Sequence, residues 1–422
     1  MGCRIASYHD EIHAVTISSL KNQNPNRKFG FFYTLKIMKQ HFLLDSSITF
    51  LNHGSFGACP KPIFEEYQRF QSELENEPVQ FIQKKAGGYL KKAKERLSKY
   101  IGCQPEDFFF TPNPTIGINT IMRSLNLQPG DEILSTNHEY GAMDRTWTFF
   151  CRKSGSKYVR QEISLPIISK EQILEDFWKG YNANTKVVFI NEISSATALI
   201  FPVKEICKKA QELGLITIVD GAHVPGHINL NIQEMDPDFY TGTLHKWMLA
   251  PKGSSFLYVK KEFQDDIDPL VVSWGYDNET INDTQFLDYH EYQGTRDISA
   301  FLCTPKVIDF LEDNNWKEVS EKCKNTVLEN YQRFCDLLHT QPLCPVSKEF
   351  LGQMASIPVK TEEPLQLKEL LFEKYTIEIP VMPLNGNFYI RYSINAYNSQ
   401  EDLDRLYDAL KEIIATTDLI QI

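Results

Sequence analysis

Short runs of apolar residues alternate with amphipathic stretches through residues 63–259. The run at 215–219 (Leu-Ile-Thr-Ile-Val) is typical, since it follows a helix-like stretch at 203–213 and ends at a carboxylate, Asp220. A strand that is apolar on both of its faces has to be covered on both, as happens in parallel sheets flanked by helices. The alternation therefore predicts an α/β fold with a mainly parallel sheet between helices.

The same reasoning places further elements along the chain. Other strands are predicted at 133–136, 157–165, 187–190, 239–243 and 255–259, and other helices at 63–77, 89–101, 115–125, 141–153 and 170–181. After about residue 294, long helices at 300–311, 316–338, 366–375 and 399–414 surround a few strands, notably 388–392. The expected organisation is an N-terminal tail or arm (1–40), a large domain (41–295) whose first residues pack on the small domain, and a smaller α+β C-terminal domain (296–422).

Composition and charge argue against several kinds of partner. The net charge of −11 and the pI of about 5.5 leave no basic surface for nucleic acid. No apolar run is long enough to span a membrane, so no membrane partner is expected. The nine cysteines form no CxxC pair, which indicates reduced thiols and a cytoplasmic location. Residues 21–40 hold five basic and no acidic residues, and a solvated tail is favoured there over an organelle-targeting signal.

Two strand ends carry side chains with a specific chemistry. Asp220 ends one predicted strand, and Lys246 closely follows the next, at 239–243. Ligands of open α/β sheets bind beyond the carboxyl ends of the strands, where both side chains are expected. A lysine that can form an imine with an aldehyde, and a carboxylate that can hold a proton on a pyridine nitrogen, are what pyridoxal 5'-phosphate (PLP) requires. The alternative for Asp220 is a turn cap, which the small residues that follow it make less favourable.

PLP also requires groups that hold a phosphate dianion. Thr115 begins a predicted helix, where free N–H groups and the helix dipole favour an anion. Thr243 and His245 share one face of a strand and could reach the same phosphate. The alternative for Thr115 is an N-cap without a ligand. Together with the lysine motif, phosphate binding is favoured.

Further side chains are candidates for the cofactor ring and the substrate. His223 could donate a hydrogen bond to the phenolate oxygen of the cofactor. Tyr140 could stack on the pyridine face or be an ordinary buried tyrosine, and His138 competes with it. Arg391 lies between apolar neighbours on a predicted strand, so its charge requires an anionic partner. That partner could be a substrate α-carboxylate held bidentately or an Asp or Glu in a structural ion pair.

No metal site is expected. His223 and His227 are four residues apart, but Pro225 and Gly226 between them prevent the helix that would aim both at one ion. The motifs HExxH, GxGxxG and GxxxxGK[ST] are absent, so zinc, nicotinamide and nucleotide-phosphate sites are disfavoured.

Six segments occur in order along the chain, at 51–57, 138–142, 220–223, 243–247, 293–297 and 391–393. Together they resemble the class V aminotransferase family of fold-type I PLP-dependent enzymes, and within it the isopenicillin N epimerase and cysteine desulfhydrase branch. The likeness runs from about residue 48 to 415. It implies a large domain with a mainly parallel seven-stranded sheet between helices, joined to a smaller α+β C-terminal domain.

The resemblance also implies roles for individual residues. The implied cofactor contacts are the imine-forming Lys246, the pyridinium partner Asp220, the phenolate donor His223, and the phosphate ligands Thr115, Thr243 and His245. Arg391 would hold the substrate carboxylate, with Asn52 and His53 at the substrate entrance. Thr295 would reach the phosphate of the neighbouring subunit, which implies a homodimer with shared sites.

Two departures from the family pattern bear on the reaction. Many relatives carry His where Glu192 aligns, which puts the contacts at that position in doubt. Cysteine desulfurases carry a nucleophilic cysteine about fifteen residues before the carboxylate-binding arginine, whereas 375–380 holds none. Persulfide-forming desulfurase activity is therefore disfavoured.

Three reactions at Cα of an amino acid are compatible with these residues. β-Elimination from cysteine or a cysteine derivative ranks first, because it requires only Lys246 and a channel for the leaving group. Epimerisation ranks second and requires another proton donor, Tyr140 or His138, on the opposite face. Transamination ranks third, since the site would also have to accept a keto acid. A non-catalytic pseudoenzyme is least favoured, because the lysine, aspartate, phosphate set and arginine are all intact.

Overall fold

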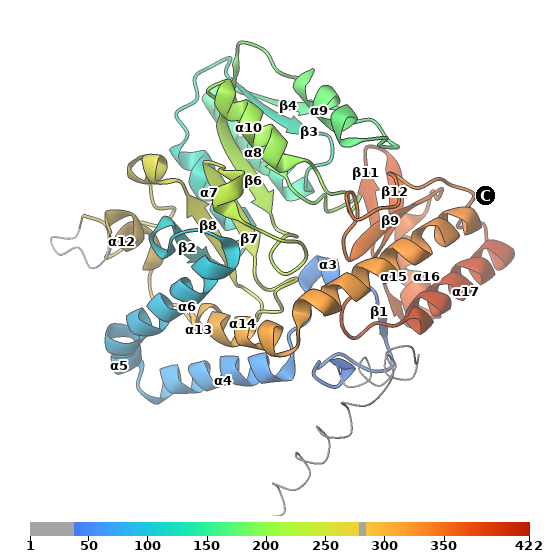
Figure 1. The fold of residues 1–422 in the computed structure, drawn as a ribbon, viewed down its shortest axis with the longest axis horizontal. Helices are drawn as coiled ribbons and strands as arrows, with labels where there is room; N and C mark the ends of the chain where they lie inside the picture. The colour runs from blue at the N-terminus through green and yellow to red at the C-terminus, as the bar shows by residue number, and fades with distance from the viewer. Residues whose placement is uncertain (1–37, 278–283) are drawn as a thin grey trace, which may run out of the picture.

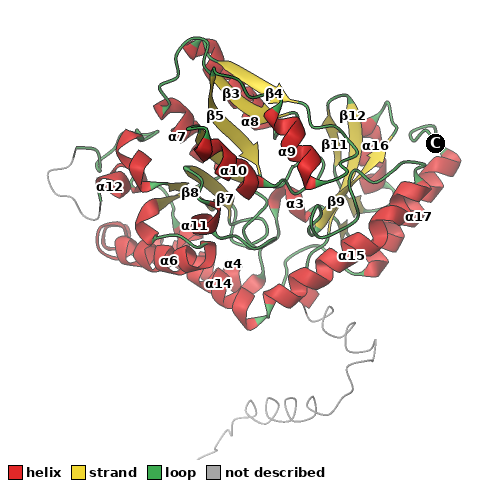
Figure 2. Ribbon diagram, turned by 45° about the horizontal axis from the view of Figure 1, so that its top comes forward, coloured by secondary structure: helices red, strands yellow, loops and turns green. Residues whose placement is uncertain are grey.

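The computed structural model of the protein describes residues 38–277 and 284–422. The predicted tail or arm at 1–40 therefore lies outside the described residues, apart from its last three. Figures 1 and 2 show the described chain in two orientations. In these ranges, none of the helices combines the length and the apolar character that crossing a bilayer requires.

Seven strands form the larger sheet: β2 (Phe108–Thr111), β3 (Glu132–Thr136), β4 (Lys157–Gln161), β5 (Thr185–Asn191), β6 (Ile216–Gly221), β7 (Phe239–Thr243) and β8 (Ser255–Val259). Their order across the sheet is β2-β8-β7-β6-β5-β3-β4. Neighbours from β7 to β4 pair in parallel, whereas β8 is antiparallel to both of its neighbours. The predicted α/β fold with a mainly parallel seven-stranded sheet is confirmed.

Both faces of the larger sheet are buried. On β5, Val188 and Ile190 belong to one apolar cluster, and Val187 and Phe189 belong to another on the opposite face. Alternate residues of a strand point to opposite faces, so two clusters require an apolar residue at every position. One face is covered by the helices α7 (Pro114–Ser124), α8 (Gly141–Ser154) and α12 (Gln285–Glu291). The other face is covered by the helices α6 (Ala86–Ile101), α9 (Lys170–Trp178) and α10 (Val203–Glu212).

A smaller antiparallel sheet lies to the right in Figure 1, in the order β11 (Val381–Leu384), β12 (Asn387–Ser393), β9 (Met354–Val359). Three helices accompany it, α15 (Trp316–Leu337), α16 (Pro364–Glu373) and α17 (Gln400–Thr416). The short strand β1 (Thr49–Phe50) pairs in parallel with β10 (Ile377–Glu378). The domain limits 41–295 and 296–422 stay a prediction.

The short helix α3 (His53–Phe56) lies between the two sheets in both views (Figures 1 and 2). Gly54 N donates to Ser393 Oγ on β12 at 3.1 Å, and a ring nitrogen of His53 lies 3.0 Å from the carbonyl oxygen of Lys246. This helix therefore connects the end of the smaller sheet to the segment that follows β7. The remaining longer helices are α4 (Lys61–Asn76) and α14 (Thr304–Asp313).

Among the local differences between the predictions and the structure, two have a physical explanation in the sequence. The predicted helix at 300–311 is two helices, α13 (Ser299–Leu302) and α14, which meet at Cys303. Pro305 lies in the first turn of α14, where its missing N–H costs nothing, but it could not continue a helix from before. The strand β2 was not predicted, because three consecutive Phe residues show no period that separates a strand from a helix.

Candidate active site

A cavity of about 240 Å³ lies at the carboxyl ends of β5, β6 and β7, beside the N-terminus of α7. Seven of the predicted site residues line it: Thr115, Tyr140, Asp220, His223, Thr243, His245 and Lys246. This is the edge of a parallel sheet at which ligands bind. The fold therefore brings together side chains from several strand ends and one helix start.

The amine of Lys246 lies against the imidazole of His223. Lys246 Nζ is 3.4 Å from His223 Nε2, and His223 Nδ1 accepts a hydrogen bond from Trp247 Nε1 at 3.3 Å. Burial and the neighbouring ammonium of Lys246 hold the pKa of His223 well below its usual value, so the ring is neutral. A neutral imidazole that accepts at Nδ1 carries its proton on Nε2. The ring therefore presents a donor toward Lys246 Nζ.

Lys246 itself has a lowered pKa of about 8. The main cause is burial, which disfavours the ammonium form. The nearby cation Arg391 lowers the pKa further, and Asp220 opposes the shift. A lysine ordinarily titrates near 10.4, so this amine is much more often neutral at pH 7–8 than a surface lysine. A neutral amine can act as a nucleophile and as a base.

The carboxylate of Asp220 lies at the tip of β6 with only 4% of the residue exposed. Its Oδ1 accepts a hydrogen bond from Ala222 N at 2.9 Å. Burial raises its pKa, while that hydrogen bond and Lys246 lower it. In the described ranges no cation forms an ion pair with this carboxylate. A cationic ligand atom would offset the buried charge, and the protonated nitrogen of a pyridine ring fits that requirement.

The start of α7 fits an anion. Asn113 is the N-cap, since its side chain accepts from Ile116 N at 3.0 Å. The alternative that Thr115 is the cap is therefore wrong. Thr115 is the second residue of the helix, so its N–H is one of the first-turn groups without an intrahelical acceptor. Such N–H groups bind phosphate.

Thr243 and His245 line the same cavity as the start of α7. The hydroxyl of Thr243 is buried and, among the described residues, has no hydrogen-bond partner. A buried polar atom without a partner is costly, and a phosphate oxygen would satisfy it. His245 Nδ1 is turned to the backbone of Ser254, at 2.9 Å from the carbonyl oxygen. Its second ring nitrogen remains for a ligand.

Arg391 does not itself line the cavity but contacts two residues that do, and 1% of it is exposed. Its Nη1 donates to the carbonyl oxygen of Ser195 and its Nη2 to Ser55 Oγ at 2.9 Å, while Nε has no hydrogen-bond partner in the described part of the chain. Within the described part of the chain no Asp or Glu pairs with it, so the alternative of a structural ion pair is not found there. Burial lowers its pKa to about 10. Both serines line the cavity, and a ligand carboxylate between them would neutralise the guanidinium.

Asn52 and His53 are buried and do not line the cavity, whereas the resemblance implied a position at the substrate entrance. His53 is fully buried, with Nδ1 2.8 Å from Tyr397 Oη and Nε2 3.0 Å from the carbonyl oxygen of Lys246. Burial lowers the pKa of His53 to about 3. Asn52 donates to Glu378 Oε1 at 2.8 Å. The physical reason is that α3 is inserted between the two sheets, so its first residues hold the backbone around Lys246 and do not face solvent.

The structure distinguishes between the candidates His138 and Tyr140, because only one of them lines the cavity. The ring of His138 is buried between Thr197 Oγ1, at 3.2 Å, and the carbonyl oxygen of Ile163, at 3.1 Å, and does not line the cavity. Tyr140 lines the cavity and is 48% exposed, so it is not an ordinary buried tyrosine. Of the two candidates, only Tyr140 is placed to meet a ligand.

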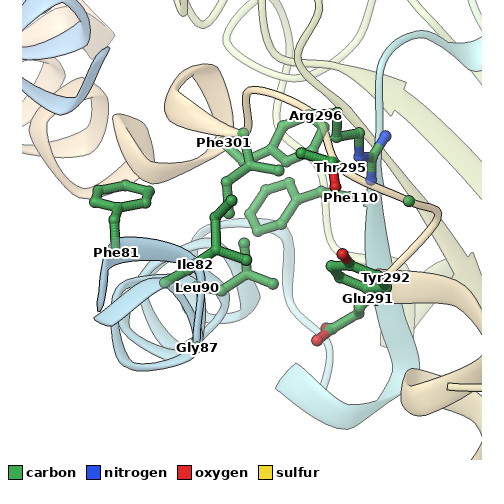
Figure 3. A pocket seen from close by; sticks show the side chains of 13 residues that line it. Phe81, Ile82, Gly87, Leu90, Phe110, Glu291, Tyr292, Thr295, Arg296 and Phe301 are labelled. Atoms are coloured by element: carbon green, nitrogen blue, oxygen red, sulfur yellow. The ribbon is translucent and has the colours of Figure 1, made fainter. Parts of the chain in front are cut away.

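Thr295 lies in a different cavity of about 210 Å³ with mainly apolar walls. Figure 3 shows it beside Arg296 and near Tyr292, across from Ile82 and Leu90. Thr295 therefore does not join the Lys246 cavity of its own chain. The implied contact with a neighbouring subunit stays a prediction.

Glu192 follows β5 and does not line the Lys246 cavity. It is 7% exposed, and its Oε2 accepts a hydrogen bond from Tyr240 Oη at 2.8 Å. Burial raises its pKa to about 7. The tyrosine hydroxyl explains how this position accommodates a carboxyl group.

Eight residues of the cavity were not predicted as site residues: Ser55, Phe56, Asn113, Pro114, Asn191, Ile193, Ser195 and Ala222. Asn191 could have been found, because it ends β5 at the same sheet edge as Asp220. Its Oδ1 is buried without a partner, while its Nδ2 donates to Glu139 Oε2 at 2.9 Å. Ser55 and Phe56 belong to a motif singled out in the sequence, but nothing local shows which of its residues face a ligand.

Gly57 allows α3 to approach the Lys246 segment. Its φ is +69° and its ψ 176°, a region that only glycine adopts readily, and an added Cβ would overlap the carbonyl oxygen of His245. We expect Gly57→Ala to lower the free energy of unfolding by about 3 kcal/mol or more, measured by urea denaturation. Gly214→Ala is the matched control, since Gly214 has φ +68° but open space around its Cβ, and about 1–2 kcal/mol is expected. Equal losses in the two variants would show that the approach to Lys246 is not tight.

Known proteins resemble this chain over nearly its whole length. Residues 57–406 match the family described as Aminotransferase class-V. The isopenicillin N epimerase of Streptomyces clavuligerus is 31% identical over 87% of this chain and 95% of its own. A probable chloroplastic L-cysteine desulfhydrase of Arabidopsis thaliana is 26% identical over 88% of this chain and 84% of its own.

The fold has solved counterparts as well. A cysteine desulfurase from Thermococcus onnurineus superposes with a TM-score of 0.78 at 20% identity, covering 90% of this chain and 98% of that one. At this identity the likeness concerns the fold alone. The family match spans most of the described residues and includes the cavity that holds Lys246 and Asp220. The chain belongs to the aminotransferase class-V family of PLP-dependent enzymes.

Proposed function

We propose that this protein is a PLP-dependent C–S lyase that acts on L-cysteine or a cysteine derivative. The observation that carries the proposal is that two groups line one cavity and a third reaches it through contacts with the lining residues Ser55 and Ser195. These groups are the Lys246 amine with its lowered pKa, the Asp220 carboxylate without an ion pair, and the Arg391 guanidinium without a carboxylate partner. In the net reaction a cysteine RS–CH2–CH(NH3⁺)–COO⁻ and water give a thiol RSH, pyruvate and ammonium.

The residues around the cavity fit PLP by their chemistry. The N–H groups at the start of α7 would hold the phosphate together with Thr243 and His245. Asp220 would hold the proton on the ring nitrogen, and His223 Nε2 would donate to the phenolate oxygen. When bound, PLP supplies an aldehyde that takes the substrate amine and a ring that accepts the electrons released at Cα.

The remaining residues orient the substrate and move its proton. Arg391, with Ser55 and Ser195, would hold the α-carboxylate at the cavity edge. Lys246 Nζ would remove the Cα proton, since its lowered pKa makes the neutral amine available. Loss of the sulfur group from Cβ then requires no further base.

The identity of the residues that line the cavity favours elimination over the alternative reactions. Among the described residues, none of the lining side chains is a cysteine, so no nucleophile is placed to take sulfur as a persulfide. Elimination requires one base, which Lys246 provides. The likeness to an L-cysteine desulfhydrase supports the same reaction.

Epimerisation is the second candidate, because Tyr140 lines the cavity and could act as a second proton donor. The likeness to an isopenicillin N epimerase supports it. Exchange of the Cα proton in D2O with inversion at Cα, and without release of pyruvate, would favour this reaction over elimination.

The direct test is an assay of the purified protein, supplied with PLP, on L-cysteine. We expect equal amounts of sulfide, pyruvate and ammonium to accumulate with time. Release no faster than that from the Lys246→Ala variant would contradict the proposed lyase activity.

We also propose that the protein is a homodimer located in the cytoplasm. The exposed position of Thr295 on the chain supports a contact across a subunit interface, as the family resemblance implies. All eight cysteines in the described ranges are free, which supports a reducing compartment. Sedimentation of the purified protein at twice the chain mass would support the dimer, and a monomer would contradict it.

Replacing Arg391 should separate substrate binding from chemistry. We expect Arg391→Lys to raise KM for L-cysteine about 10- to 100-fold with a smaller change in kcat, because a lysine cannot hold a carboxylate bidentately. Arg333→Lys is the matched control, since Arg333 pairs with Asp404 away from the cavity. A loss in kcat alone would show that Arg391 does not anchor the substrate.

The lowered pKa of Lys246 gives a pH dependence that can be measured on cofactor-free protein. Acylation requires the neutral amine, so its rate at Lys246 should rise with pH and reach half its maximum near pH 8. In Arg391→Gln this midpoint should move to higher pH, because one neighbouring cation is removed. Competitive labelling followed by peptide mass spectrometry would measure both midpoints. A midpoint near 10.4 would contradict the expected desolvation of this amine.

A further inference from the structure

One large aromatic side chain beside the Lys246 cavity is mostly exposed. Phe56 ends α3, lines the cavity, and is 71% exposed. It follows Ser55, whose hydroxyl accepts a hydrogen bond from Arg391 Nη2 at 2.9 Å. A substrate whose α-carboxylate is held by Arg391 would therefore lie next to the Phe56 ring.

The charged side chains and the histidines that line the described cavity, Asp220, His223, His245 and Lys246, belong to the part that fits the cofactor. Apart from these four, the described residues that line the cavity carry no charge. They include the aromatic and apolar side chains of Phe56, Tyr140, at 48% exposure, and the buried Ile193, beside the polar Ser55, Ser195 and Asn191. Arg391 is the cation next to the substrate side, and the α-carboxylate would use it.

We infer that Phe56 sets the substrate preference, and that the preferred substrates are L-cysteine thioethers with an uncharged, apolar S-substituent such as an aromatic group. This inference rests on the proposed lyase function and specifies its substrate class. Free cysteine has no substituent that could cover the ring. An anionic substituent would meet no further cation among the described residues that line the cavity outside the part that fits the cofactor.

The expected preference for apolar S-substituents follows from the exposure of the Phe56 ring to solvent. An aromatic side chain that is exposed beside a cavity gains stability when an apolar group covers it, by removal of both surfaces from water. The contact forms only with substrates that extend beyond Cβ, so it separates thioethers from free cysteine.

The reaction with S-benzyl-L-cysteine is balanced without an oxidant or reductant. The Cα–H and Cβ–S bonds break, the sulfur leaves with the electron pair and takes up a proton, and water hydrolyses the three-carbon product. S-Benzyl-L-cysteine and water thus give phenylmethanethiol, pyruvate and ammonium.

The test compares kcat/KM for pyruvate release from three substrates: L-cysteine, S-benzyl-L-cysteine and the anionic S-carboxymethyl-L-cysteine. We expect S-benzyl-L-cysteine to exceed both of the others by about tenfold or more, which corresponds to about 1.4 kcal/mol. Phe56→Ala should remove this preference by lowering only the S-benzyl value, and Phe56→Leu should retain part of it. Phe149→Ala is the matched control, because Phe149 is a phenylalanine that is 50% exposed but lies on α8 and does not line the cavity.

The possible results distinguish a failure of the proposed lyase function from a failure of the role assigned to Phe56. If none of the three substrates yields pyruvate, the lyase function itself fails. If the wild-type protein processes all three equally, or prefers free cysteine, the lyase function stands and the role of Phe56 is overturned. If Phe56→Ala lowers all three values alike and changes the mass of the particle in solution, then Phe56 is covered by a second copy of the chain, which also overturns the inference.

Discussion

Replacing Lys246 with alanine is expected to lower the rate of pyruvate release from L-cysteine by about a thousandfold or more. Lys246 would provide both the amine that attaches the cofactor and the base that removes the Cα proton, and a positioned general base alone contributes about 10²–10⁴. The same variant should lose the visible absorbance of the cofactor-loaded protein. Borohydride reduction followed by peptide mapping should place a pyridoxyl group on the Lys246 peptide of the wild-type protein.

The control for this variant is Lys186→Ala, which removes an exposed lysine on strand β5 of the same sheet. It should leave both the rate and the absorbance unchanged. A pyridoxyl group found on another lysine, or a Lys246→Ala protein with unchanged rate, would refute the assignment of the site.

Replacing Asp220 with asparagine is expected to lower kcat by about 10²–10³, the range seen when a preorganised electrostatic contact to a transition state is removed. An asparagine can keep the hydrogen bond from Ala222 N, which Asp220 Oδ1 accepts at 2.9 Å. It cannot hold a proton on a ring nitrogen. Removal of a buried charge should leave the stability of the cofactor-free protein equal or higher. The variant should therefore be folded and slow.

Asp238→Asn provides the matched control. Asp238 is also buried on the larger sheet, but it lies before β7, at the opposite end from the cavity, and accepts hydrogen bonds from Thr217 N and Oγ1. This variant should lower the melting temperature and leave kcat unchanged. If Asp238→Asn and Asp220→Asn reduced kcat alike, the effect of Asp220 would be a general loss of packing.

The sequence predicted the architecture and much of the cavity because both depend on local signals. Strands such as β5 contain an unbroken apolar run, 187–190, since each face of the sheet meets its own cluster of side chains. Asp220 and Lys246 were predicted to lie together because parallel strands end at one edge of the sheet. The same rule would have added Asn191, which ends β5.

The tertiary structure decided the questions that depend on residues far apart in the chain. The contact between His53 and the Lys246 carbonyl joins positions 193 residues apart, and the contact between Arg391 and Ser195 joins positions 196 apart. The sequence could not show that His53 is buried and does not line the cavity, that Tyr140 and not His138 reaches it, or that no carboxylate in the described ranges pairs with Arg391.

Thus the sequence by itself determined the fold class, the family and the cofactor chemistry, because periodicity and strand-end residues are properties of short segments. Only the tertiary structure decided which side chains around the substrate face the cavity. Those side chains come from α3, from the segments after β3 and β5, and from β12, and their relative positions are set by how the two sheets pack around α3.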